Sequence, residues 1–291
     1  MSAPCSRLTP TGSMEIHLGG KMKKRGWVWL VLAVLGTSGA AALFWPVDAK
    51  RFVMPPVSLA TSTVTGDDLT RAAKTRLFFG HMSVGENMLT GIDTLYSAHG
   101  ISAPAIVEVG PDATAGQRVG GVVLHAHIGE NGDPLGKLKN FDARMRGGLA
   151  EQVNVALLKF CYIDFDSATD AEALFSAYRQ TLDALERDFP NVTFLHATAP
   201  LMVAPTGPKE RVKALLRGDP NTVRERYNRL VRGAYPGDRL VDIAAIESTG
   251  PDGDVSGALY PGFSTDGGHL NETGSALVAG GLVRALARVA S

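Results

Sequence analysis

Two nearly continuous apolar runs, residues 153–160 and 192–197, constrain the fold more than any other feature of the sequence. Each has the length of a strand, and a strand without polar alternation is typical of the buried centre of a parallel sheet. The segment between them, residues 170–188, repeats apolar residues at helical spacing. Alternation of buried strands with helices predicts a parallel sheet covered by helices on both faces.

The chain after residue 66 continues this alternation, so we predict a single α/β domain over residues 67–291. The architecture expected is a three-layer αβα sandwich with a mostly five-stranded parallel sheet, which binds ligands beyond the carboxyl ends of its strands. The five predicted strands are residues 77–79, 105–109, 153–160, 192–197 and 240–243. The predicted helices are residues 84–98, 170–188, 220–234 and 271–289, and the glycine-rich stretch 110–132 is expected to be a long loop.

The amino-terminal part of the chain has the pattern of an export segment. A basic cluster at residues 21–25 precedes roughly twenty residues without a charge, about enough to cross a bilayer as a helix. We predict a membrane anchor or a signal peptide over residues 22–45, with the basic flank in the cytoplasm. Residues 1–21 would be a disordered or cytoplasmic tail, and the Pro-, Ser- and Thr-rich residues 46–66 a linker. The domain is then expected on the outer (periplasmic or extracellular) side of the inner membrane, or secreted after cleavage.

The distribution of charge argues against a nucleic-acid partner. The formal charge of the whole chain is zero, and because residues 1–45 carry five basic side chains and one acidic, the rest is mildly acidic. A protein that binds phosphate backbones needs a basic face. The two cysteines, Cys5 and Cys161, do not suggest a disulfide framework.

A candidate nucleophile lies near the start of the predicted domain. An apolar run ends at Gly80, Ser83 follows within a tight turn, and a helical pattern begins at Val84. A turn from strand to helix can hold a hydroxyl above the edge of a sheet, beside the first amides of the helix. Serine is also a common helix cap, and this stretch alone leaves both interpretations open.

A second motif stands just before the last predicted helix, where Asp266 precedes His269 by three residues in a glycine-rich loop. An aspartate can orient an imidazole and support its charge, and the imidazole can take a proton from a serine hydroxyl. Alone, the motif also fits a loop whose side chains cap neighbouring backbone. Together with Ser83 it forms a candidate triad, in a chain order unlike that of ordinary α/β-hydrolases because the aspartate and histidine are almost adjacent.

The sequence resembles the SGNH (GDSL-like) hydrolases at residues 80–85 (GHMSVG) and 266–271 (DGGHLN), and the resemblance extends over most of residues 75–290. It implies a flavodoxin-like αβα fold of the SGNH-hydrolase type. It also implies that Ser83 is the nucleophile, His269 the general base and Asp266 its orienting partner. The chain departs from the family pattern in the spacing between Gly80 and Ser83, where the family has Gly-Asp-Ser, and in lacking the family's Gly-x-Asn-Asp after the third strand.

The missing asparagine matters because it is the family's side-chain donor to the oxyanion. Losing one such donor typically lowers the rate about 10²–10³-fold. The amide of Ser83 can supply one donor, and the loop after the second predicted strand offers Gly129 or Asn131 as a replacement. The alternative for that loop is an ordinary Asn-Gly turn.

Three further residues are candidate substrate contacts. His81 lies within the serine motif, and Tyr162 and Asp164 follow a predicted strand at its carboxyl end, where ligands of parallel sheets bind. Tyr162 and Asp164 can equally be turn residues.

A histidine pair raises the question of a metal. His125 and His127 would share a face of an extended segment, and with His81, Asp266 and His269 they could form a zinc site. No further ligand spacing supports such a site, so we expect neither a metal nor another cofactor.

These features predict an exported or membrane-tethered serine esterase that hydrolyses a small-molecule or carbohydrate ester, such as an acylated envelope carbohydrate, through Ser83, His269 and Asp266. Two alternatives remain: an acyltransferase that uses the same triad, and a non-catalytic envelope-binding protein that retains the fold. The sequence does not indicate the oligomeric state.

Overall fold

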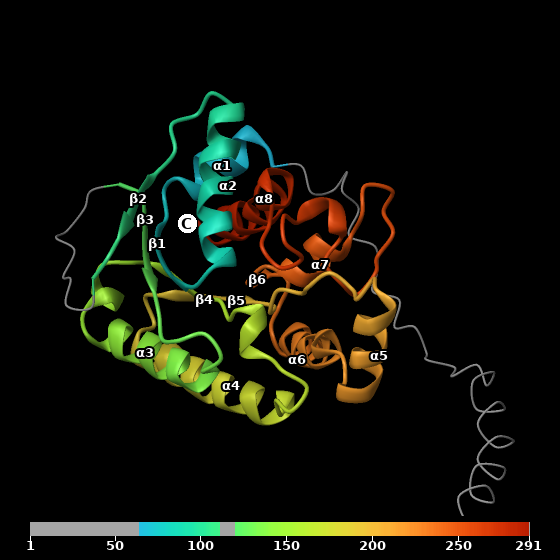
Figure 1. The fold of residues 1–291 in the computed structure, drawn as a ribbon. Helices are drawn as coiled ribbons and strands as arrows, with labels where there is room; N and C mark the ends of the chain where they lie inside the picture. The colour runs from blue at the N-terminus through green and yellow to red at the C-terminus, as the bar shows by residue number, and fades with distance from the viewer. Residues whose placement is uncertain (1–63, 111–119, 291) are drawn as a thin grey trace, which may run out of the picture. The chain divides into compact units, whose positions relative to one another are not determined.

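Six strands form one sheet in the computed structural model, which describes residues 64–110 and 120–290 (Figure 1). The strands lie in the order β2-β3-β1-β4-β5-β6, and every pairing between neighbours is parallel. Their bounds are β1 (Arg76–His81), β2 (Ala105–Glu108), β3 (Val122–His127), β4 (Val155–Leu158), β5 (Thr193–Ala197) and β6 (Leu240–Val241). The parallel α/β architecture is as the sequence predicts.

The predicted number of strands was wrong, because residues 122–127 lie in strand β3 and not in a loop. This strand pairs with β1 on one side and β2 on the other, and its first five residues are buried. Its two histidines and the glycines before and after it hide the apolar pattern in the sequence. The last predicted strand was also too long, since Ile243 begins a helix.

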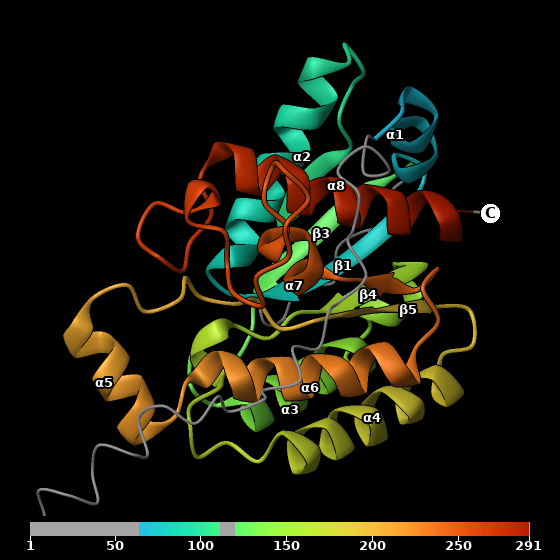
Figure 2. The ribbon, with the colours of Figure 1, turned by 90° about the vertical axis from the view of Figure 1, so that its right-hand side faces the viewer.

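Helices cover both faces of the sheet (Figures 1 and 2). One face carries α1 (Gly66–Ala72), α2 (Val84–Ala98), α7 (Ile243–Ser248) and α8 (Glu272–Val289), and the other carries α3 (Pro134–Arg146), α4 (Ala171–Asp188) and α6 (Pro220–Ala234). A further helix, α5 (Pro208–Arg217), precedes α6, and short 3₁₀ turns lie at η2 (Leu149–Glu151), η3 (Tyr162–Asp164) and η4 (Pro261–Phe263). The predicted three-layer arrangement is confirmed, whereas α1, α3, α5 and α7 were not predicted.

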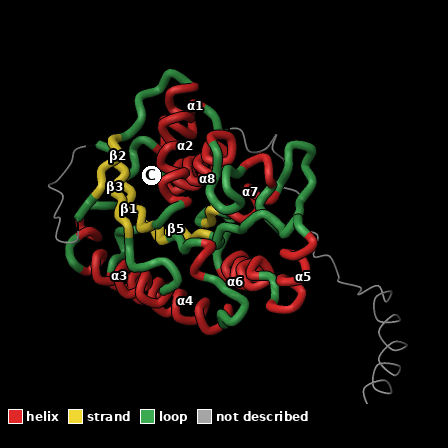
Figure 3. Tube along the Cα trace, viewed as in Figure 1, coloured by secondary structure: helices red, strands yellow, loops and turns green. Residues whose placement is uncertain are grey.

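The central strand β1 supplies side chains to two separate cores, because successive residues of a strand point to opposite faces. Leu77 and Phe79 pack beneath α2 and α8, whereas Phe78 packs on the other face and stacks on Phe141 of α3, with ring centroids 5.6 Å apart. The tube in Figure 3 shows the strands enclosed between these helices. With both faces buried, the carboxyl edge of the sheet is where polar side chains can gather.

The close approach of α2 to α8 positions the two segments that carry the candidate triad. A Cβ atom on Gly91 of α2 would lie 2.3 Å from the carbonyl oxygen of Ser275 in α8, so only glycine permits this contact. Because Ser83 immediately precedes α2 and the Asp266–His269 loop immediately precedes α8, packing the two helices brings the motifs together across 186 residues of sequence.

The predictions for residues 1–21, 22–45 and most of 46–66 lie outside the described residues. Among the helices of residues 64–110 and 120–290, none combines the length and hydropathy needed to cross a bilayer.

Candidate active site

Ser83 occupies a strained turn between β1 and α2. Its backbone has φ of 48° and ψ of −99°, and no other non-glycine residue in the described part of the chain has a positive φ. Such a conformation is costly for a residue with a Cβ, and it is found where a function requires it. The Ser83 side chain makes no capping hydrogen bond to helix α2. The structure therefore contradicts the helix-cap interpretation of this serine.

The loop that carries Asp266 and His269 is held by its own hydrogen bonds. The Oδ1 atom of Asp266 accepts from the backbone amides of Gly268 at 3.0 Å and His269 at 2.8 Å. The hydroxyl of Ser264 donates to the carbonyl of His269 at 2.7 Å. The amide of the next residue, Leu270, donates to Asn87 of α2 at 3.2 Å. The imidazole is therefore fixed against the helix that follows Ser83.

The three side chains form a continuous hydrogen-bonded chain. Ser83 Oγ lies 2.7 Å from His269 Nε2, and His269 Nδ1 lies 2.6 Å from Asp266 Oδ2. Hydrogen bonds from the side chain and backbone of His269 hold the pKa of Asp266 well below its ordinary value. An ionised carboxylate only accepts hydrogen bonds, so we assign the proton to Nδ1, which leaves Nε2 to accept from the serine hydroxyl. The side chains of His269 and Asp266 are 40% and 55% exposed, and a substrate can therefore reach them.

Tyr162 borders this chain. Its ring meets the imidazole of His269 edge-on, with centroids 5.7 Å apart, and its side chain lies near Ser83. Burial raises the pKa of Tyr162 above its ordinary value. A Cβ atom on Gly268 would lie 2.8 Å from Tyr162 Cζ, so a glycine here makes room for the ring. Tyr162, a predicted substrate contact, is thus adjacent to the candidate nucleophile.

The prediction that Asp164 contacts substrate was wrong. Its side chain is fully buried, and both carboxylate oxygens lie 2.7 Å from Lys137 Nζ. Its oxygens also accept from the backbone amides of Gly132 at 2.9 Å and Cys161 at 2.7 Å. Through these four contacts the carboxylate joins helix α3 to the turns after β3 and β4. Both of its oxygens are therefore engaged by the protein and not by a ligand.

The predicted oxyanion donors lie beside the same ion pair. Asn131 Oδ1 accepts a hydrogen bond from Lys137 Nζ at 3.1 Å, and a Cβ atom on Gly129 would lie 2.8 Å from Lys137 Cγ. In the described part of the chain, no hydrogen bond joins Gly129 or Asn131 to Ser83. The role of these two residues stays a prediction, and Lys137, which fixes their loop, was not anticipated.

The prediction that His81 contacts substrate was also wrong. The His81 side chain is 0% exposed, and its Nε2 lies 3.1 Å from His125 Nδ1. Burial, assisted by the charge of Lys159 and by the neighbouring histidines, lowers the pKa of His81 to about 2. The structure brings His81 and His125 together, as the sequence suggested, and adds Glu86 of α2 to them. Asp266 and His269 are not part of this group, because they bond to each other in the candidate triad. Glu86 escaped notice because an acidic residue in the first turn of a helix is common for electrostatic reasons.

A polar groove adjoins the triad loop on the side where α2 meets the start of α8. It has a volume of about 370 Å³. Asn87 lies one turn of α2 beyond Ser83, and Leu270 follows His269 directly. The groove is lined by Asn87, Thr90, Thr94, Leu270, Asn271, Glu272 and Ser275. Amide, hydroxyl and carboxylate groups of this kind suit a ligand with several hydroxyls.

The described domain is thus a three-layer α/β domain with a Ser-His-Asp chain of hydrogen bonds at the carboxyl edge of its parallel sheet. No protein-family model matches the sequence, and neither does any curated protein.

Several solved structures are similar to this chain at low sequence identity, among them the following two. One is described provisionally as a platelet activating factor from Streptococcus pneumonia, with 16% identity and a TM-score of 0.45 over 74% of this chain and 89% of its own. The other is described provisionally as a lipolytic protein of the G-D-S-L family from Desulfitobacterium hafniense DCB-2, with 14% identity and a TM-score of 0.41 over 72% of this chain and 99% of its own.

Proposed function

We propose that this protein is a serine esterase that hydrolyses an acyl ester through Ser83, His269 and Asp266. The observation that carries the proposal is the 2.7 Å contact between Ser83 Oγ and His269 Nε2, made by a serine whose backbone is strained and whose hydroxyl does not cap its helix. A helix-capping serine would have an ordinary backbone and a bond to its own helix.

The reaction proceeds in two balanced halves. Ser83 Oγ attacks the acyl carbon as its proton passes to His269 Nε2, and the imidazolium that forms is stabilised by Asp266. The tetrahedral intermediate collapses, the ester C–O bond breaks, and the alcohol leaves with the proton from His269. Water then attacks the acyl-enzyme, gives a proton to His269, and the acid departs as Ser83 recovers its hydrogen.

The negative charge of the tetrahedral intermediate requires donors beside Ser83. The backbone amide of Ser83, at the amino-terminal end of α2, supplies one side of this oxyanion hole. Gly129 or Asn131 remains our candidate for a second donor. Tyr162, whose ring packs edge-on against His269, is positioned to contact the acyl group or the leaving oxygen.

The substrate class follows from the polar groove and from the predicted export of the domain. Side chains of asparagine, threonine and serine line the groove, and these bind sugar hydroxyls better than they bind an alkyl chain. An exported domain on a membrane anchor would meet acylated carbohydrates of the cell envelope. We therefore propose an acylated carbohydrate as the ester.

The test compares covalent labelling with turnover. The full chain, purified in mild detergent, is treated with a fluorophosphonate probe and separately with p-nitrophenyl acetate. We expect both labelling and hydrolysis, and loss of both in Ser83→Ala. Ser97→Ala, which changes an exposed serine on the same helix, is the matched control and retains both.

Other outcomes distinguish the alternatives. A wild-type protein that neither labels nor hydrolyses would refute the esterase and favour a binding protein. Labelling in Ser83→Ala equal to wild type would place the nucleophile elsewhere. Acid released only when a sugar acceptor is present would identify an acyltransferase that uses the same three residues.

A further inference from the structure

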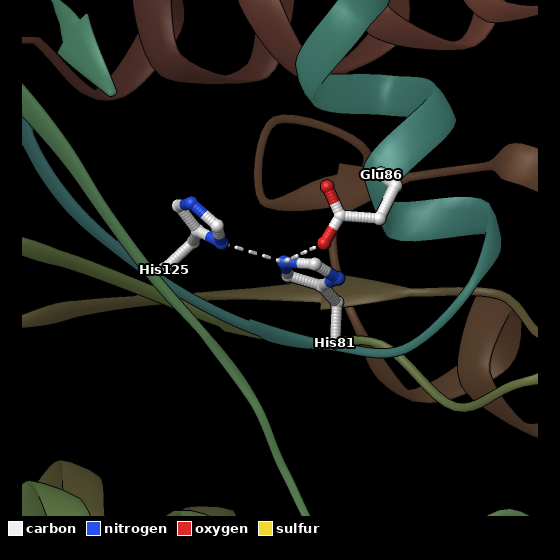
Figure 4. A group of neighbouring side chains, drawn as sticks. All are labelled: His81, Glu86 and His125. Atoms are coloured by element: carbon white, nitrogen blue, oxygen red, sulfur yellow. Dashed lines mark hydrogen bonds and ion pairs between the residues drawn. The ribbon is translucent and has the colours of Figure 1, made fainter. Parts of the chain in front are cut away.

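A second cluster of chemically active side chains lies on the other side of the Ser83 turn. His81 ends β1, His125 lies in β3, and Glu86 lies in the first turn of α2 (Figure 4). One donor atom from each of these three side chains lies within 4.8 Å of the other two. His127, two residues beyond His125 in the same strand, contacts Glu86 with Nε2 2.8 Å from Oε1. None of these residues belongs to the candidate triad.

We propose that His81, His125 and Glu86, with His127 as a fourth ligand, form a binding site for a divalent transition metal, zinc being the ion that this donor set fits best. Imidazole nitrogens combined with a carboxylate oxygen are ligands that zinc prefers in proteins. The proposal goes beyond ester hydrolysis and does not depend on it.

The distances match the size of such a site. Zinc binds nitrogen and oxygen at about 2.0–2.1 Å in tetrahedral geometry, which places the ligand atoms of one ion about 3.3–3.4 Å apart. His81 Nε2 lies 3.1 Å from His125 Nδ1 and 3.9 Å from Glu86 Oε1. The donor atoms of His125 and Glu86 lie within 4.8 Å of each other, so closing the set around one ion needs a movement of the half-exposed Glu86 side chain of at most about 1.5 Å.

The surroundings of the cluster resemble those of a metal site. Metal-binding histidines commonly give their second ring N–H to a carboxylate, which fixes the tautomer. Glu108 of β2 is the carboxylate in this position, because its Oε1 lies 3.5 Å from His127 Nδ1. The other ring nitrogen of His127, Nε2, then faces Glu86. His81 and His125 are buried, whereas the side chains of Glu86 and His127 are 48% and 47% exposed. The cluster therefore has two fixed inner ligands and an open side through which an ion can enter.

A glycine shapes the cluster as well. A Cβ atom on Gly85 would lie 2.3 Å from the ring atoms of His81, so glycine alone allows the first turn of α2 to lie against that ring. This close approach brings Glu86 to the histidines. A bound ion would join β1, β3 and α2 on either side of Ser83, and would stabilise the strained turn in its observed conformation.

Metal binding is measured directly. The full chain in mild detergent is stripped with EDTA, exchanged into metal-free buffer and titrated with zinc chloride, and bound zinc is measured by mass spectrometry and by competition with a chromogenic chelator. We expect one zinc per chain. His125→Gln should weaken zinc binding at least about 100-fold, and Glu108→Gln about 10–100-fold, the range for residues that orient a ligand.

A second ligand variant and a control variant complete the test. Glu86→Gln changes a half-exposed side chain, so it should fold with the circular dichroism of wild type while zinc no longer raises its Tm. His99→Ala removes an exposed histidine outside the cluster and should bind zinc as wild type does. The proposal is overturned if wild type retains no more zinc than the buffer control. It is equally overturned if His125→Gln binds as wild type does, or if zinc is lost in His269→Ala instead, which would place the ion at the triad.

Discussion

Two aspartates at the carboxyl edge of the sheet, Asp266 and Asp164, have opposite surroundings. Asp266 is 55% exposed, accepts from the His269 ring at 2.6 Å and holds a loop whose imidazole reaches Ser83. Asp164 is fully buried and neutralises Lys137, with backbone amides completing its contacts. Each carboxylate orients a nitrogen-bearing side chain, but only in the first case does that side chain reach an exposed hydroxyl.

The comparison shows that position at the ligand-binding edge of a parallel sheet does not by itself make a polar residue functional. What distinguishes Asp266 is that its partner remains open to solvent and can take a proton from a nucleophile. Asp164 instead has every oxygen engaged by the protein, so it stabilises the turn that carries Tyr162. If this distinction holds, changes at Asp266 should affect turnover and changes at Asp164 should affect stability.

The largest effect is expected for Asp266→Asn. An asparagine cannot hold His269 in the tautomer that accepts the serine proton, and loss of the corresponding aspartate in serine hydrolases lowers kcat about 10⁴-fold. Turnover of p-nitrophenyl acetate, with KM determined separately, measures this. Asp252→Asn, an exposed aspartate elsewhere in the domain, is the control. A decrease smaller than tenfold would show that Asp266 does not support the base.

Asp164→Asn should produce the reverse result. Removing one partner of a buried ion pair leaves a charge without compensation and lowers the free energy of unfolding by about 3–5 kcal/mol. Urea unfolding followed by circular dichroism measures the loss. Activity per fluorophosphonate-titrated site should remain close to that of wild type.

The double variant Lys137→Met/Asp164→Leu sharpens this test. It removes both charges, so it should be less destabilised than Asp164→Asn. A substantial increase in KM with unchanged stability in Asp164→Asn would instead restore the substrate role that the sequence suggested.

The sequence predicts the layers of this fold because buried strands and amphipathic helices have distinct periods, and the runs at 153–160 and 192–197 are unambiguous. Strand β3 was missed because His125 and His127 interrupt its apolar pattern. Ser83, Asp266 and His269 could be named from short motifs and are brought together by helix packing. The partners of Asp164 and His81 could not be named, since Lys137 and His125 are 27 and 44 residues away in sequence and no local pattern encodes those contacts.

A smaller effect is expected for Tyr162→Phe, which keeps the ring against His269 and removes only the hydroxyl. A single neutral hydrogen bond contributes about 1 kcal/mol, so kcat should fall about fivefold with little change in Tm. Tyr260→Phe, at a half-buried tyrosine that packs on Phe263, is the control. If Tyr162→Phe leaves both kcat and KM unchanged, the hydroxyl has no part in the reaction. Tyr162 would then resemble Asp164, as a residue that lies near the site but only stabilises the fold.

The smallest effect concerns how Asp266 contributes to stability as the pH changes. Its hydrogen bonds lower its pKa in the folded protein, so at acid pH the unfolded chain binds a proton before the folded chain does. The stabilisation is therefore fully present above the ordinary aspartate value of about 3.8 and is lost as the pH falls below it. Because the side chain is half exposed, the contribution should be under about 1 kcal/mol. Urea unfolding of wild type and Asp266→Asn at pH 7, 5 and 3 should give the same difference at the first two values and a smaller one at pH 3. A difference that is as large at pH 3 as at pH 7 would mean that Asp266 titrates as an ordinary exposed carboxylate, with the same pKa in the folded and unfolded chains.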